Sequence, residues 1–287
     1  SQKGGNVGNI DSQSFSQSNS MIAKAAFVTL ILIVFIICLT IGSQILQWLF
    51  SPSRSPKLLN GMKRAGPNEE LIISSNPQKK GAVPILRSND ERYGVEFAWS
   101  VWIYINNLDY MEGYRKHIFH KGSAPLGASQ ADGSPSQQEE GVEDPWSAAI
   151  NESPGLYLHK NNNSLIVVMD TFKGYSENIE IDDIPTQKWL NVIIRVEGNI
   201  VDVYINGSIA HRHILNDVVK QNYGDTYINV NGGFDGFMSN LQYFSWAPSI
   251  SEILRIINDG PNLNMIEDNT SGLEVFPPYL STRWYFN

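Results

Sequence analysis

The sequence has only one cysteine, Cys38, among its 287 residues. No disulfide can therefore form between two cysteines of this sequence. This favours a reducing compartment, because secreted β-rich domains of this size often carry at least one disulfide. Cys38 lies inside the most apolar stretch of the sequence, where a small buried hydrophobic side chain is a more common role than a reactive thiol.

Charged residues are also scarce, at 17% of the sequence, whereas 42% of the residues are hydrophobic. This composition excludes wholesale disorder and a collagen-like fibre. The formal net charge of −8 is unevenly distributed, with +1 on residues 1–50, +4 on residues 51–90 and −13 on the remainder. An acidic main part repels phosphate backbones, so we expect no nucleic-acid binding.

No charged residue occurs between Ala25 and Phe50. A helix over residues 25–50 is about 39 Å long, which is enough to cross a lipid bilayer. The predicted membrane anchor consists of apolar side chains along this helix and one aromatic side chain near its end: Ala25, Phe27, Leu30, Phe35, Ile41 and Trp48. The alternatives to a span are a buried core helix and a cleaved signal peptide. The signal peptide is less consistent with the sequence, because the apolar run is long, a polar leader precedes it and no A-x-A site follows.

Cations on the two sides of the predicted span indicate its orientation. Lys3 and Lys24 precede the span, and Arg54, Lys57, Lys63 and Arg64 follow it. The positive-inside rule therefore places the C-terminal part on the cytoplasmic side. The four N-x-S/T sequons of the sequence are close to the number expected by chance and do not argue for a lumenal domain.

Two polar segments flank the span. Residues 1–24 are predicted to be a flexible polar tail, since fifteen of the first 20 residues are Ser, Gln, Asn or Gly. Residues 51–92 contain five prolines and no sustained hydrophobic period, which is typical of an extended tether. The cations of this basic tether either contact anionic lipid head groups or remain solvated, and the sequence leaves both open.

From residue 93 onward the hydrophobic pattern alternates with period two, which is typical of β-strands. One face of the first predicted strand consists of Phe97, Trp99, Val101, Ile103 and Ile105. Further strand-like runs cover residues 117–121, 155–160, 164–170, 178–182, 189–197, 200–206, 208–214, 226–230, 237–246 and 279–286. Many short strands joined by Gly, Asn and Asp turns predict an all-β, antiparallel sandwich.

One short helix is predicted within this β-rich part. Pro248-Ser249 begins it and Gly260-Pro261 ends it. Its predicted apolar face consists of Ile250, Ile253, Leu254 and Ile257.

A long acidic insertion, residues 122–152, interrupts the strands and contains six acids and no Lys or Arg. Loops of this length are usually functional or disordered. Within it, Trp146, Glu139 and Glu140 are candidate partner-contact residues, because an aromatic side chain in an acidic loop can anchor a partner. Trp146 is equally compatible with packing under the sheet edge.

The stretches FAWSVWIYINN (97–107), KWLNVIIRVEGNIVDVYINGSIAHRHI (188–214) and GGFDGFMSNLQYFSWAPSISEILRIINDGP (232–261) resemble a laminin-G-like jelly roll of the concanavalin A-like lectin/glucanase superfamily. The resemblance covers residues 93–287. It implies a jelly-roll fold, but it leaves the function open, because such modules bind glycans or proteins.

The complete layout resembles membrane-anchored minor capsid and membrane proteins of large icosahedral DNA viruses of algae. The features that carry this resemblance are the polar tail, the single span, the basic tether and a domain that opens with WIYINNLDYMEGYRKHIFHKG (102–122). It implies a place between an internal membrane and the capsid shell of the virion.

The superfamily also includes retaining glycosidases, whose active sites carry an E-x-D-x-E or E-x-D-x-x-E pattern on one strand. Such enzymes need two carboxyl groups about 5–5.5 Å apart. Glu180 and Asp182 match the first two acids, but the third position falls on Ile184 or Pro185. Because neither residue can donate a proton, we expect no hydrolase activity.

Metal binding has weak support in the sequence. Asp170, Asp225, Asn231 and Asp235 are candidate calcium ligands at strand ends, although Asp and Asn commonly stabilise turns there. The pairs His117/His120 and His211/His213 lack the further ligands of a zinc set and are predicted to lie on the surface. No P-loop, Rossmann glycine set or nucleophile elbow is present.

The sequence therefore predicts a non-enzymatic structural protein without a required cofactor, which is anchored in a lipid bilayer by one helix. Its acidic jelly-roll domain is expected to bind basic surfaces of other proteins, and the resemblance implies capsid proteins. The alternative is a membrane-anchored lectin, in which loop aromatics stack on sugars and carboxylates or calcium hold the hydroxyl groups.

Overall fold

The computed structural model describes residues 21–49, 51–88, 94–125, 151–173 and 177–266. The chain divides into two compact units, residues 1–51 and residues 52–287.

The first unit contains helix α2 (Met21–Leu49), which has 29 residues and no buried side chain. At about 1.5 Å per residue it is about 44 Å long, so it is long enough to cross the hydrocarbon core of a bilayer. Its hydroxyl groups are satisfied within the helix: Thr29 Oγ1 donates to Ala25 O and Thr40 Oγ1 donates to Ile36 O, each at 2.9 Å. Cys38 lies on the surface of this helix among its apolar side chains, so its expected burial there depends on a bilayer and stays a prediction.

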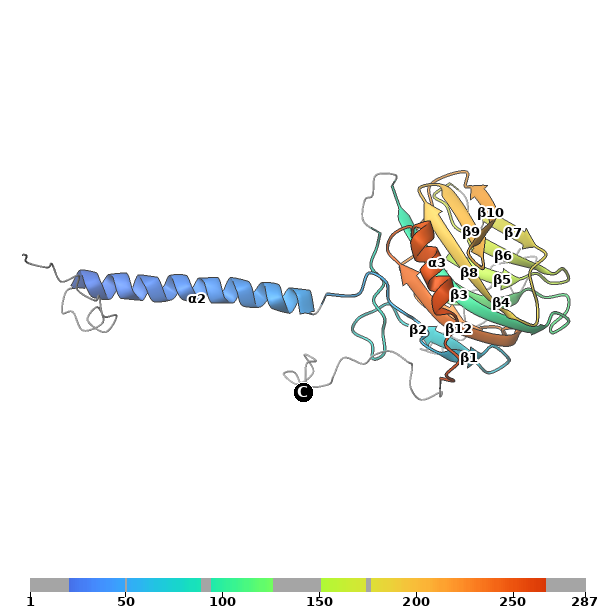
Figure 1. Ribbon diagram of the computed structural model, residues 1–287, viewed down its shortest axis with the longest axis horizontal. Coiled ribbons are helices and arrows are strands. Elements are labelled where there is room, and N and C mark those ends of the chain that lie inside the picture. Colours follow the sequence, from blue (N-terminus) through green and yellow to red (C-terminus); the bar gives the residue numbers. More distant parts are fainter. Residues whose placement is uncertain (1–20, 50, 89–93, 126–150, 174–176, 267–287) are drawn as a thin grey trace, which may run out of the picture. The chain divides into compact units, whose positions relative to one another are not determined.

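The second unit is an antiparallel β-sandwich of two six-stranded sheets, as predicted (Figure 1). Sheet 1 has the strand order β1 (Met62–Arg64), β12 (Asp235–Phe244), β3 (Glu96–Asn107), β8 (Trp189–Glu197), β9 (Ile200–Ile205) and β10 (Ser208–Ile214). Sheet 2 has the order β2 (Leu71–Ile73), β11 (Asp225–Ile228), β4 (Lys116–Gly122), β5 (Glu152–Leu158), β6 (Ser164–Met169) and β7 (Glu177–Asp182).

The main core lies between the two sheets. The predicted inward face of β3 is confirmed, because all five of its residues are buried in this core: Phe97, Trp99, Val101, Ile103 and Ile105. Val167 and Met169 of β6 belong to the same core from the opposite sheet. The alternating pattern of the sequence therefore identifies the face of sheet 1 that contacts sheet 2.

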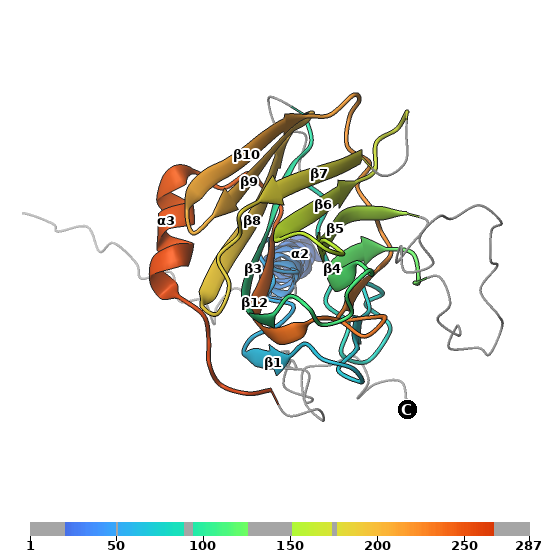
Figure 2. The same cartoon turned by 90° about the vertical axis from the view of Figure 1, so that its right-hand side faces the viewer.

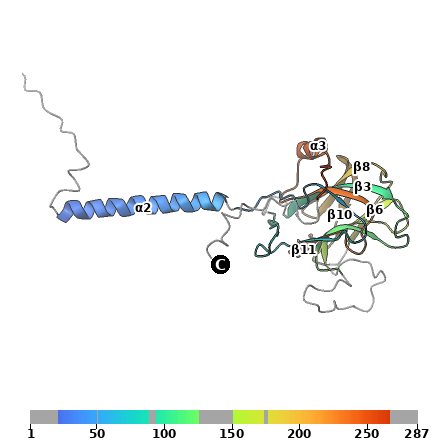
Figure 3. The same cartoon turned by 90° about the horizontal axis from the view of Figure 1, so that it is seen from below.

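Helix α3 (Ile250–Asp259) covers part of the outer face of sheet 1 (Figures 2 and 3). It begins at a capping box in which Ser249 and Glu252 satisfy each other's backbone N–H groups, and Gly260 ends it with a φ of 69°. Ile253 is buried against the sheet. Ile250 and Leu254, however, are 69% and 50% exposed, so the predicted apolar face is only partly covered.

Residues 52–88 differ from the predicted extended tether. They supply β1 and β2, which are strands of the two sheets, and the amides of Leu58 and Leu59 donate to Leu241 O. Lys63 Nζ lies 2.8 Å from Glu69 Oε2, and the guanidinium of Arg54 lies 5.7 Å from the centre of the Trp246 ring. These two cations are held by the sandwich, since the segment is part of the fold.

Candidate binding site

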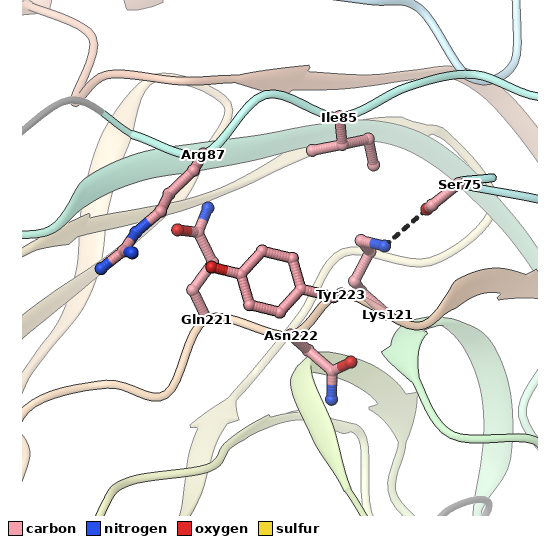
Figure 4. Close-up of a pocket in the computed structure, with 7 residues that line it drawn as sticks. All are labelled: Ser75, Ile85, Arg87, Lys121, Gln221, Asn222 and Tyr223. Carbon is pink, nitrogen blue, oxygen red and sulfur yellow. Dashed lines mark hydrogen bonds between the residues drawn. The ribbon is translucent and has the colours of Figure 1, made fainter. Parts of the chain in front are cut away.

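One cavity of the sandwich, with a volume of about 100 Å³, is lined by side chains from three separate segments (Figure 4). The segment before β3, the end of β4 and the segment before β11 contribute Ser75, Ile85, Arg87, Lys121, Gln221, Asn222 and Tyr223. A smaller space adjoins it and reaches the core residues Trp99 and Tyr243 and the hydroxyl-bearing Ser153. The two spaces share the lining residues Ile85, Lys121, Gln221 and Asn222.

Lys121 supplies a buried cation to this cavity. Its Nζ donates to Ser75 Oγ at 2.7 Å and to the carbonyl oxygen of Gly224. Asp225 holds Ser75 in place, because Asp225 Oδ1 accepts the backbone N–H of Ser75 at 2.9 Å. Burial lowers the pKa of Lys121 to about 8, and the charge of Asp225 opposes this shift. The ammonium is therefore held in a fixed position by neutral oxygen acceptors.

Gln221 is held by a chain of hydrogen bonds. Its Nε2 donates to the hydroxyl oxygen of Tyr243 at 3.1 Å, and that hydroxyl donates to Leu86 O at 2.9 Å. Burial raises the pKa of Tyr243, so its hydroxyl remains protonated and keeps the chain intact. The other amide atom, Gln221 Oε1, and Ser153 Oγ are buried and have no hydrogen-bond partner in the described part of the chain.

The charge of the cavity is opposite to that of the protein. Its seven lining residues include two cations, Arg87 and Lys121, and no carboxylate, although the chain has a net charge of −8. Arg87 and Tyr223 are exposed at the mouth, and in the view of Figure 4 the ring of Tyr223 lies between the side chains of Arg87 and Lys121. The arrangement provides donors and one free acceptor to a small ligand.

A second polar cluster lies within sheet 2. Glu152 is buried, its Oε2 accepts a hydrogen bond from the Tyr157 hydroxyl, and its backbone N–H donates to Asp170 Oδ2 at 2.8 Å. Burial is the main cause that raises the pKa of Glu152 to about 8, whereas the hydrogen bond from Tyr157 lowers it. Glu152 is therefore mainly protonated at neutral pH.

The two histidine pairs differ in their surroundings. His117 and His120 are fully buried and pack against Tyr157 and Tyr227, respectively, so the prediction that they lie on the surface is wrong. In the second pair, His211 is exposed and His213 is partly exposed, with its Nε2 3.3 Å from Glu177 Oε2.

Three of the calcium candidates, Asp170, Asp225 and Asp235, accept hydrogen bonds with their side-chain oxygens, whereas the contact of Asn231 is made by its backbone. Asp170 and Asp225 are engaged as described above, Asp235 Oδ1 accepts from Asn106 Nδ2 at 3.1 Å, and the backbone N–H of Asn231 donates to Glu70 Oε1 at 3.1 Å. Among the described residues, no group of three or more His, Cys, Asp or Glu side chains is placed to hold a metal ion. A calcium site at these residues remains a prediction.

The glycosidase-like acids lie on the edge strand β7. Glu180 Oε1 accepts from Ser164 Oγ at 2.6 Å, and Asp182 is exposed. Ile184, which stands where a retaining enzyme has its second glutamate, is buried in the main core. The apolar side chain therefore belongs to the packing of the sandwich.

Trp146, Glu139, Glu140 and the predicted strand 279–286 lie outside the described residues. The cavity itself was not predicted from the sequence. Lys121 stands at the end of a strand-like run, and Gln221 and Tyr223 stand in an irregular segment. Only the contact between these distant segments brings them together, so no local motif identifies them.

No protein-family model and no curated protein matches the sequence. Among solved structures, the receptor binding domain of botulinum neurotoxin D is similar, with 14% identity over 69% of this chain and 44% of that chain, at a TM-score of 0.47. The binding domain of Paraclostridial Mosquitocidal Protein 1 has 15% identity over 69% of this chain and 42% of that chain, at a TM-score of 0.46.

A third structure is the botulinum neurotoxin serotype D ligand binding domain in complex with N-acetylneuraminic acid, with 14% identity over 72% of this chain and 46% of that chain, at a TM-score of 0.48. The chain spans less than half the length of these three solved chains.

Proposed function

We propose that the protein is a non-enzymatic, single-pass membrane protein whose β-sandwich binds other proteins. Helix α2 carries the proposal, because none of its 29 residues is buried and its central side chains are almost all large and apolar. In water such a surface is unfavourable, whereas a bilayer covers it. The predicted anchor residues all lie on this helix, with Trp48 one residue before its end.

The resemblance of the layout supports a narrower role, a viral minor capsid protein that links an internal membrane to the capsid shell. In this role the sandwich is on the cytoplasmic side of the membrane, as the positive-inside rule predicts. Its acidic charge suits basic surfaces of shell proteins. Trp146, Glu139 and Glu140 are the proposed contact residues in the acidic insertion.

A membrane-anchored lectin is the second candidate, and the cavity favours it. Sugars are bound by combinations of hydrogen-bond donors, acceptors and an aromatic ring. Lys121, Gln221 and Tyr223 supply these three kinds of group at one cavity. Binding to immobilised glycans favours the lectin, and stable co-purification with shell proteins after detergent extraction favours the linker.

Membrane anchorage is tested with the full chain by flotation with liposomes and by alkaline carbonate extraction. The double variant Leu32→Arg/Ile36→Arg places two charges in the middle of α2, at a cost of about 5–7 kcal/mol for insertion. We expect the wild-type chain to float and to resist extraction, and the variant to do neither. The matched control, Ile209→Arg/Ile214→Arg, adds the same charges to exposed positions of β10 and should float like the wild type. Equal behaviour of the two variants would contradict the proposal.

The side of the membrane is tested by protease digestion of sealed vesicles. Digestion of the sandwich from the cytoplasmic side, without glycans, supports the linker. Protection together with glycosylation at Asn151, Asn162, Asn206 or Asn269 would overturn the orientation and favour a binding module outside the cytoplasm.

A further inference from the structure

The cavity at Lys121 has hydrogen-bonding capacity that the described protein does not use. An ammonium group has three N–H donors, and two acceptors for Lys121 are present, Ser75 Oγ and Gly224 O. Gln221 Oε1 and Ser153 Oγ are buried without a partner in the described residues. Buried polar atoms that lack a partner destabilise a protein by about 1–3 kcal/mol each, so a ligand that satisfies them gains binding energy.

The charges select an anion. Arg87 at the mouth and Lys121 deeper in the cavity are both cationic, and no acidic side chain is among the described residues that line the cavity. The planar guanidinium of an arginine matches a carboxylate with two parallel hydrogen bonds. Gln221 Oε1 accepts only, so the same ligand must also carry a donor such as a hydroxyl group.

The apolar lining residues favour a ligand with a carbon skeleton. Ile85 and the ring of Tyr223 line the cavity beside the polar groups. A compact inorganic anion cannot use these apolar surfaces, whereas a ring or short chain of carbon atoms packs against them. The volume of about 100 Å³ admits only part of a sugar ring, so the hydroxyl-bearing end enters the cavity and the carboxylate stays at the mouth beside the exposed Arg87.

We propose that this cavity binds a small hydroxylated carboxylate of the acidic-monosaccharide class. Its carboxylate pairs with Arg87, and its hydroxyl groups bond to Gln221 Oε1 and the Lys121 ammonium. The proposal rests on the glycan-binding candidate and names its ligand class. It does not depend on membrane anchorage or on binding to shell proteins.

Isothermal titration of the full chain in detergent micelles tests the proposal with two probes, glucuronate and glucose. Glucuronate carries a carboxylate at the position where glucose carries a hydroxymethyl group. We expect glucuronate to bind at least about tenfold more tightly than glucose, and Arg87→Gln to weaken glucuronate binding by about tenfold, which corresponds to about 1.4 kcal/mol. Arg87 is exposed, so this variant is expected to fold.

Lys80→Gln is the matched control, because it removes the same charge from an exposed position of the same segment that does not line the cavity. It should change the affinity for glucuronate by less than about twofold. Equal affinities for glucose and glucuronate, full affinity of Arg87→Gln, or binding of inorganic phosphate as tight as that of glucuronate would each overturn the proposal. Flotation of the same variants with liposomes separates a failure of this site from a failure of the anchor.

Discussion

His117 and His120 form one continuous hydrogen-bond chain, in which His117 Nε2 lies 2.7 Å from His120 Nδ1. The backbone N–H of Val230 donates to His117 Nδ1 at 3.2 Å, so the proton of the neutral His117 ring is on Nε2. That proton is donated to His120 Nδ1, and His120 Nε2–H donates to Ser123 O at 3.0 Å. Both rings therefore have the same neutral tautomer.

This chain predicts that both histidines remain neutral in mild acid. A second proton on either ring would bring two N–H groups face to face, and burial lowers the pKa of His120 to about 4 and that of His117 well below 6.5. We expect ¹⁵N signals of the Nε2–H tautomer for both rings from about pH 7 down to about pH 5. The spectra require a histidine-labelled full chain, and His211→Asn identifies the signal of an exposed ring. An imidazolium signal from His117 or His120 at about pH 6 would contradict the tautomer assignment.

The raised pKa of Glu152 makes the stability of the protein depend on pH in the alkaline direction. Because its pKa in the fold, about 8, exceeds the ordinary value of 4.5, its contribution to stability is fully present below pH 4.5 and is lost as the pH rises to about 8. In Glu152→Gln the side chain is neutral at every pH, and its amide has nearly the same shape as the carboxyl group. Between about pH 6.5 and 8, the free energy of unfolding of the wild type should fall by about 1 kcal/mol per pH unit relative to this variant.

Urea unfolding of the full chain in micelles, followed by tryptophan fluorescence, measures this difference. Asp183→Asn is the control, because Asp183 is exposed in the turn after β7, and the variant should have the same pH slope as the wild type. If the wild type and Glu152→Gln have the same pH slope, the Glu152 carboxyl group is ionised in the fold.

Much of the sandwich was predictable from local patterns. The strands 189–197 and 208–214 have the predicted bounds, because their apolar residues and turn residues agree. The Gly and Asn turns expected between strands occur at Gly198, between β8 and β9, with a φ of 63°, and at Asn206-Gly207, between β9 and β10, with φ values of 50° and 83°. These positions need the left-handed conformation that Gly and Asn tolerate.

The surroundings of the histidines could not be predicted in the same way. In a regular strand, residues 117 and 120 point to opposite faces, because their separation is odd. The pairing of β4 with β5 shifts register between His117 and Phe119, and the two rings meet on one face. A β-bulge depends on the partner strand, so periodicity within β4 does not reveal it. The cavity depends in the same way on contacts between segments distant in sequence.

Strands β1 and β2 were missed because each has only three residues and their segment contains five prolines. If residues 52–88 belong to the fold, truncation of a buried side chain there must destabilise it. Leu59→Ala removes a side chain that is 2% exposed, and we expect a loss of about 3 kcal/mol. Ile72→Ala, at a position 59% exposed in β2, is the matched control and should cost less than about 1 kcal/mol. Equal, small effects in urea unfolding would restore the tether interpretation.

The outer face of sheet 1 has one carboxylate that should be more important for stability than the exposed acids. Asp202 is 1% exposed, and it accepts from Arg212 Nε at 2.5 Å, from Arg212 Nη2 at 2.9 Å and from Arg195 Nη1 at 3.4 Å. Asp202→Asn removes the charge that both guanidinium groups share, and we expect a loss of about 3 kcal/mol. Asp182→Asn, at an exposed position, is the control and should have little effect in the same unfolding assay.

Arg212→Gln should cost less than Asp202→Asn, because solvent reaches the Arg212 side chain and Arg195 remains beside the carboxylate. The double variant should lose less stability than the sum of the losses in the two single variants, because the first substitution already breaks the contact between the two side chains. Full additivity would mean that Asp202 and Arg212 do not interact, and that Asp202 is stabilised by Arg195 alone. A larger loss for Arg212→Gln would instead mean that the aliphatic part of Arg212 contributes more by packing on β9 and β10 than its charge does.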